Sequence, residues 1–217
     1  NQGKHNVTIY ANDSANNLNY TTISFTVDIP NINITFPTSN NTFTNNANLT
    51  VNYTTSDSIS AISSVWYSND TYTTNKSLGS SPTFFNITNI TWSEGQHNVT
   101  IYINNTPNLP GSNTISFTID TVAPSPTLSC DLSSVNTGAI ITCNCSATDA
   151  TSGVQAISYT ANPATNLTGT LSTSCTATDY AGNSATQNFA YSVSNLPEPV
   201  APPSTGGGVV SGVVAPA

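Results

Sequence analysis

The chain has 217 residues, a formal net charge of −8 at pH 7, and charged side chains at only 6% of its positions. Lys4 and Lys76 are its only basic residues besides two histidines, so it lacks the positive charge needed to bind nucleic acid or anionic membrane surfaces. The length suits about two domains. The apolar residues show no helical periodicity and no stretch long enough to cross a bilayer. The composition therefore favours an all-β protein with no membrane span in this chain.

One pair of sequence segments occurs twice. Residues 5–11 (HNVTIYA) return as residues 97–103 (HNVTIYI), and residues 23–28 (ISFTVD) return at the same offset as residues 115–120 (ISFTID). Apolar and polar residues alternate within these segments, which predicts half-buried strands. The spacing between the two copies is about the length of one immunoglobulin-like (Ig-like) sandwich domain. We therefore predict tandem Ig-like β-sandwiches.

Residues 1–28 are predicted to hold two strands, at 5–11 and 20–27, joined by a turn at 12–17. By the repeat, these are the last two strands of an Ig-like domain that is incomplete within this chain. Two strands alone are marginally stable in water, so we expect the other strands from preceding chain or from a neighbouring molecule. The absence of an initiator methionine and of a signal peptide favours a mature fragment or an interior part of a longer secreted protein.

Residues 29–120 are predicted to form a complete Ig-like sandwich. Its expected strands, separated by turn-forming residues, are 32–36, 48–55, 62–67, 83–88, 99–103 and 114–119. Trp66 is expected to be the core aromatic, and Trp92 is expected to close one end of the sandwich.

Residues 121–195 are predicted to form a second complete sandwich. Its expected strands are 127–130, 139–148, 154–160, 169–178 and 185–193. Residues 196–217 are rich in proline and glycine, which is typical of a linker. The alternative for this tail is that residues 209–214 (VVSGVV) act as a strand donated to a neighbour's open sheet edge.

Four cysteines lie within one third of the chain, and their even number favours two disulfides over a four-cysteine zinc site, which usually has two CxxC knuckles. Cys145 and Cys175 lie at the same distance before an Asp, on strands that face each other in an Ig-like sandwich. We therefore expect the pairs Cys145–Cys175 and Cys130–Cys143, with Cys143–Cys175 as the alternative.

Fifteen Asn-x-Ser/Thr sequons are spread over the chain, and each is an acceptor for N-glycosylation. Those on strands have apolar or cysteine neighbours of opposite parity, so their asparagines are expected to point outward. We predict that sugar supplies the solvation that charge normally provides; the alternative is chance occurrence in a sequence rich in Asn, Thr and Ser. The predicted sites are Asn6, Asn12, Asn19, Asn33, Asn40, Asn48, Asn52, Asn69, Asn75, Asn86, Asn89, Asn98, Asn104, Asn144 and Asn166.

The sequence contains none of the common catalytic or nucleotide-binding motifs, so we predict a protein that is not an enzyme and has no cofactor other than N-linked glycans. His5 and His97 occupy equivalent repeat positions, which favours a structural role. The aspartates lie at strand ends and turns, where this residue normally binds local backbone N–H groups. Calcium between domains, held by Asp28, Asp120, Asp149 and Asp179, is kept as an alternative.

Residues 94–102 (EGQHNVTIY) and 115–124 (ISFTIDTVAP) resemble the tandem Ig-like repeats of archaeal cell-surface and S-layer-type proteins. Residues 145–149 (CSATD) and 175–183 (CTATDYAGN) resemble bacterial Ig and hyalin-repeat-like domains. The resemblance covers most of residues 1–195. It implies glycosylated stalks, coats, adhesins or filaments outside the cell.

Together these features predict a structural component of an extracellular, glycosylated surface appendage, filament or coat. Its subunits are expected to join head to tail, with the incomplete first sandwich completed across the junction. One alternative is an adhesin or carbohydrate-binding module with an exposed aromatic platform, for which Tyr67, Tyr72 and Tyr180 are the candidates. The other is a set of spacer domains in a larger surface enzyme.

Overall fold

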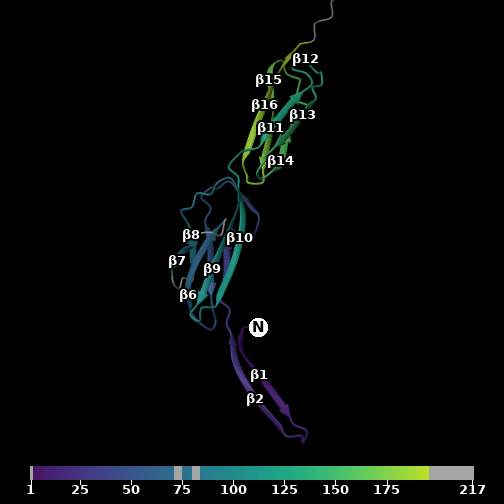
Figure 1. Cartoon of the computed structure of the whole chain (residues 1–217). Helices are drawn as coiled ribbons and strands as arrows, with labels where there is room; N and C mark the ends of the chain where they lie inside the picture. The colour runs from purple at the N-terminus through teal and green to yellow at the C-terminus, as the bar shows by residue number, and fades with distance from the viewer. Residues whose placement is uncertain (1, 71–74, 80–83, 196–217) are drawn as a thin grey trace, which may run out of the picture.

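A computed structural model describes residues 2–70, 75–79 and 84–195. Every regular element in these residues is a β-strand, and none of them forms a helix able to span a membrane. The strands make three units that follow one another along an extended line: a lone hairpin at one end and then two sandwiches (Figure 1). The tail 196–217, with its predicted linker or donor strand, lies outside the described residues.

The first unit is the hairpin of β1 (Gly3–Asn12) and β2 (Leu18–Val27), which pair antiparallel. Asp13 organises the turn, because its Oδ1 accepts the N–H groups of Ala15 and Asn17, each at 2.9 Å. Hydrogen bonds from the side chain and backbone of Asn17 lower the pKa of Asp13. The turn at the end of the hairpin is thus held by its own hydrogen bonds.

The second unit is a sandwich of two sheets. One sheet has the order β4-β10-β9-β6-β7 and the other the order β3-β5-β8. The pairing of β4 with β10 is parallel, and the other pairings are antiparallel. The strands are β3 (Asn31–Phe36), β4 (Thr42–Thr44), β5 (Val51–Ser56), β6 (Ile62–Asn69), β7 (Lys76–Gly79), β8 (Phe84–Ile87), β9 (Gly95–Asn105) and β10 (Pro110–Ile119).

Alternating side chains of the facing sheets fill the core of this sandwich. Val99, Ile101 and Phe117 are fully buried, while the residues between them along each strand are polar or face outward. Trp92 is part of this core: its ring lies 5.0 Å from that of Phe117, and its Nε1 donates to the carbonyl oxygen of Leu49 at 2.9 Å. Trp92 is therefore a packing residue of this core, and its expected place at the end of the sandwich stays a prediction.

The expectation that Trp66 is the core aromatic is wrong. Val65 and Tyr67 are buried, whereas Trp66 lies between them on the opposite, half-exposed face of β6. Its cross-strand partner is Tyr102 on β9, and the two rings stack with their centroids 5.6 Å apart. Strict alternation along the strand therefore outweighs the apolar character of the indole.

Tyr53 makes the second sandwich sensitive to alkaline pH. Burial raises the pKa of Tyr53 to about 12, whereas its ordinary value in the unfolded chain is about 10. Above pH ~10 the unfolded chain loses this proton first, so stability is lost as pH rises, by about 2–3 kcal/mol near pH ~12. Urea titrations followed by tryptophan fluorescence across this range measure the loss. The variant Tyr53→Phe should show a shallower decline, and an unchanged slope would contradict the assignment.

The third unit is a smaller sandwich. The sheet β12-β16-β15-β14 faces the pair β11-β13, and β12 runs parallel to β16 as β4 does to β10. Its buried core includes Leu128, Ile141, Cys175 and Tyr191. The strands are β11 (Ser125–Cys130), β12 (Ser134–Asn136), β13 (Cys143–Thr148), β14 (Val154–Tyr159), β15 (Gly169–Asp179) and β16 (Ser184–Ser194).

Candidate functional site

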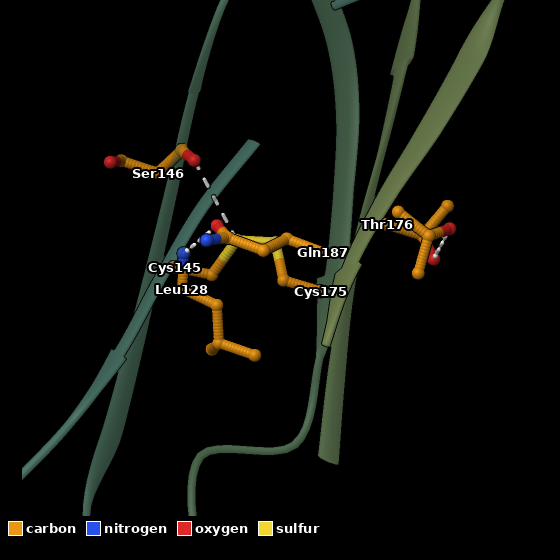
Figure 2. Close-up of a disulfide and its surroundings, with 7 residues drawn as sticks. Leu128, Cys145, Ser146, Cys175, Thr176 and Gln187 are labelled. Carbon is orange, nitrogen blue, oxygen red and sulfur yellow. Dashed lines mark hydrogen bonds between the residues drawn. A yellow bond between two sulfur atoms is a disulfide. The ribbon is translucent and has the colours of Figure 1, made fainter. Parts of the chain in front are cut away.

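Two disulfides hold the third sandwich, and they have the pairing expected above. Cys130 and Cys143 are directly opposed on β11 and β13. Cys145 on β13 is joined to Cys175 on β15, so this second bridge links the two sheets across the core (Figure 2). The bridge Cys145–Cys175 takes the place that large apolar side chains occupy in the second sandwich.

A partly buried hydrogen bond reinforces the same contact between sheets. The side chain of Gln187 on β16 lies beside the disulfide, and its Oε1 accepts the backbone N–H of Leu128 on β11 at 2.6 Å (Figure 2). Because β11 and β16 belong to different sheets, this bond and the disulfide fix the spacing of the layers together.

The first hairpin reproduces β9 and β10 in register as well as in sequence. Gly3 pairs with Val27, and Gly95 pairs with Ile119; both pairs are shifted by the same 92 residues (95 − 3 and 119 − 27). The cross-strand bond between Thr8 and Thr22 hydroxyls has its counterpart between Thr100 and Thr114. The hairpin therefore has the geometry of two core strands of a sandwich.

The apolar face of the hairpin differs from its counterpart only in what covers it. Phe117 is 0% exposed, whereas the equivalent Phe25 is 47% exposed; Ile101 is 0% exposed and Ile9 is 55% exposed. We call this surface the open hairpin face, and it consists of Val7, Ile9, Ile23 and Phe25, equivalent to Val99, Ile101, Ile115 and Phe117.

None of the fifteen sequon asparagines is buried. Eleven are exposed and four are half-buried, namely Asn52, Asn69, Asn98 and Asn104. Asn33 shows the pattern, since it is exposed on β3 while its neighbour Ile32 is buried in the core. Each asparagine is therefore at least partly exposed, and glycan occupancy remains a prediction.

His97 is a structural residue. It is buried beside Trp92, its Nδ1 lies 3.0 Å from Asp70 Oδ2, and its Nε2 lies 2.8 Å from the carbonyl oxygen of Ser93. The equivalent His5 stacks on Phe25 with ring centroids 5.6 Å apart. The two histidines lie in separate units, so they do not form a shared site.

The joint between the hairpin and the second sandwich, which we call the first joint, contains two carboxylates and an amide. Asn105, at the end of β9, donates from Nδ2 to Asp28 Oδ2 at 3.0 Å and to Asp57 Oδ2 at 3.1 Å. Burial opposes ionisation of Asp57, but the N–H groups of Ser60 and Ile59 and the Asn105 amide together hold its pKa below the usual value. The amide therefore bridges the two carboxylates by hydrogen bonds and adds no charge to the joint.

The joint between the second and third sandwiches, the second joint, contains three carboxylates. One oxygen each from Asp120, Asp149 and Asp179 lie within 4.8 Å of one another, and Asp120 and Asp179 are 0% exposed. The Ser152 N–H crosses the joint, donating to Asp120 Oδ2 at 3.0 Å and Asp149 Oδ1 at 2.9 Å. Of the four aspartates named together in the sequence, the structure assembles these three and leaves Asp28 at the first joint.

The predicted aromatic platform is wrong in part. Tyr67 is buried in the core of the second sandwich, and Tyr72 lies outside the described residues. Tyr180 is exposed, and its ring lies 6.1 Å from that of Phe43 across the second joint. The described residues therefore retain one of the three tyrosines as a surface aromatic, where it serves as a contact between sandwiches.

The facing sheets, the parallel edge strand that recurs in both complete units and the inter-sheet disulfide define an all-β protein of tandem Ig-like sandwiches. Residues 30–115, which span nearly all of the second sandwich, match a family described as a bacterial Ig domain. No curated protein matches the chain.

Several solved structures are similar to this chain at low sequence identity. The fibronectin(III)-like modules of Clostridium thermocellum CbhA have 14% identity and a TM-score of 0.41, covering 76% of this chain and 94% of that chain. Domains 3–6 of protocadherin gammaB7 have 16% identity and a TM-score of 0.32, covering 88% of this chain and 58% of that one. The Bacteroides ovatus protein SGBP-B has 12% identity and a TM-score of 0.30, covering 78% and 48%.

Proposed function

We propose that this chain is a structural, non-enzymatic part of an extracellular, N-glycosylated surface appendage or coat built from serial Ig-like sandwiches. The observation that carries the proposal is the separation of the two kinds of side chain. Apolar residues and cysteines fill the cores, whereas eleven of the fifteen sequon asparagines are exposed and none is buried. Two disulfides support an extracellular location, because such bonds form in oxidising compartments. The sequence resemblance to archaeal cell-surface and S-layer-type repeats supports the same setting.

The open hairpin face supports assembly from repeated copies. Its four large apolar side chains are about half exposed. Fully burying such a side chain contributes about 1.5–3 kcal/mol, so covering the exposed half of each contributes about 1 kcal/mol. A neighbouring copy that supplies the missing sandwich strands covers this face by a head-to-tail, non-closing contact, which generates a filament. The sugars then lie outside the contact and protect the remaining sheet edges from aggregation.

Glycopeptide mass spectrometry of protein isolated from the native cell surface tests the glycan part of the proposal. We expect sugar on most of the eleven exposed sequons and lower occupancy at the four half-buried ones. Asn31 is the matched control, because it is exposed on the same strand as Asn33 but is not part of a sequon. A bare polypeptide would contradict the proposal.

Light scattering of the purified chain over a range of concentrations tests the assembly part. If a second copy binds to the open hairpin face, the average molar mass should increase with protein concentration. If the chain stays monomeric and residues 1–28 remain ordered, the head-to-tail contact does not exist. If the face is instead covered by strands of the same polypeptide in longer versions of the protein, those versions stay monomeric while the 217-residue chain associates.

A further inference from the structure

The two joints are built from the same repeat, but their carboxylates have different hydrogen-bond partners. Asp28, Asp57 and Ser60 at the first joint correspond to Asp120, Asp149 and Ser152 at the second, each 92 residues later (120 − 28, 149 − 57 and 152 − 60). Asp57 and Asp149 each accept backbone N–H groups from the turn that follows them.

The two joints differ in the residue that ends a neighbouring strand, which is Asn105 at the first joint and Asp179 at the second. Asn105 ends β9 and accepts the N–H of Leu109, four residues on, at 2.8 Å; Asp179 ends β15 and accepts the N–H of Asn183, also four residues on, at 2.8 Å. The turns are therefore equivalent. Asn105, however, donates its amide hydrogens to both carboxylates, whereas an aspartate has nothing to donate.

A serine hydroxyl gives an independent sign that a ligand belongs at the second joint. At the first joint Ser60 Oγ donates to Asp57 Oδ2 at 3.1 Å. The equivalent Ser152 is 7% exposed, and its buried Oγ has no hydrogen-bond partner. Its own N–H donates to both Asp120 and Asp149, so Ser152 lies at the carboxylate cluster.

No cationic side chain of the third sandwich offsets the charge of these carboxylates. The Asn183 amide donates to Asp179 Oδ2 at 2.8 Å, which satisfies a lone pair but cancels no charge. Residues 121–195 contain no lysine, arginine or histidine. Carboxylates removed from water need a paired or coordinated cation. Backbone N–H groups satisfy some of their lone pairs, as at the first joint, but they do not cancel a third negative charge.

We infer that the second joint is a calcium site, with Asp120, Asp149 and Asp179 as carboxylate ligands and Ser152 Oγ beside them. The set consists only of oxygen atoms, which Ca²⁺ prefers, and water completes its six to eight ligands. Because Asp120 follows the last strand of the second sandwich while Asp149 and Asp179 belong to the third, the ion fixes the joint between them. This inference does not depend on the proposed assembly.

Calcium titration of the intact 217-residue chain tests the site. After removal of divalent ions with EDTA, we expect one binding event in isothermal titration calorimetry, with Kd of about 10⁻⁴–10⁻³ M, as in extracellular calcium modules. Saturating calcium should raise the Tm of the third sandwich by about 5–15 °C. Mg²⁺ at the same concentration should produce a much smaller shift, because it demands a tighter octahedral geometry.

The variant Asp179→Asn gives the second joint the residue that the first joint already has. It should fold, because Asn105 supports the same turn, and it should lose the calcium-dependent shift of Tm and bind calcium at least about tenfold more weakly. The reciprocal variant Asn105→Asp should make the second sandwich respond to calcium. A wild-type chain that shows neither binding heat nor a shift of Tm overturns the inference, and so does an Asp179→Asn variant that responds as wild type does.

Discussion

Replacing Phe117 by alanine is expected to lower the free energy of unfolding of the second sandwich by about 3–5 kcal/mol, because the ring is fully buried and its loss leaves a cavity. The Phe117 ring lies 5.0 Å from that of Trp92 and 5.8 Å from that of His97, so the cavity opens beside the tryptophan. Both tryptophans of the chain lie in this sandwich. Urea titration followed by tryptophan fluorescence therefore measures the effect on this unit.

Phe25→Ala is the matched control, because Phe25 holds the same repeat position on the open hairpin face. In dilute chain it should change the tryptophan-monitored stability by no more than a few tenths of a kcal/mol, since it lies outside that core. In the assembled protein the same substitution should lower the association constant between copies several-fold. Equal effects of the two substitutions on the second sandwich would show that the hairpin is part of its core.

Removing the inter-sheet disulfide is expected to have a comparably large effect on the third sandwich. The bridge closes a loop with a sequence separation of 30 residues, for which chain entropy gives about 3–4 kcal/mol. The double substitution Cys145→Ala with Cys175→Ala also removes buried sulfur from the core. We expect the calorimetric transition of this sandwich to move to much lower temperature or to disappear at 37 °C.

The double substitution Cys130→Ala with Cys143→Ala separates this effect from a general loss of cross-linking. Its bridge spans 13 residues and joins neighbouring strands of one sheet, so its removal should cost about 3 kcal/mol. The tryptophan transition of the second sandwich should stay in place in both variants. A third sandwich that keeps its full transition without Cys145–Cys175 would contradict the structural role of that bridge.

Sequence alone was sufficient for the features that depend on repeated or alternating residues. The repeat of HNVTIY predicted the hairpin, and its parity correctly predicted the inward side chains of β9, from Val99 to Ile103. The distance from each of Cys145 and Cys175 to the following Asp identified the pair that the structure joins. These inferences succeed because a strand has a strict two-residue period.

The short strands could not be predicted, for a physical reason. β4 and β12 have three residues each and pair in parallel with β10 and β16, which come more than 50 residues later in the chain. Three residues show no alternation, and the partner of an edge strand is set by tertiary contacts. Trp66 faces outward, where it pairs with Tyr102 of β9, and this cross-strand partner cannot be read from the sequence of β6 alone.

The joints were predicted only in part. Three aspartates of the second joint were already grouped as a calcium alternative, but Asp28 belongs to the first joint, and its partners Asp57 and Asn105 were missed. The spacing of 92 residues from Asp57 to Asp149 was the signal that could have found them. The proposed difference between the two joints depends on one residue, Asn105 at the first joint and Asp179 at the second. The hydrogen bonds of these two residues are visible only in the structure.

Electron cryo-microscopy of material isolated from the native cell surface tests the structural role most directly. We predict rows of sandwiches joined end to end, sugar density at the outward asparagines, and strands of a neighbouring copy packed on the open hairpin face. Separate particles that lack sugar and expose this face to water would contradict the proposed role.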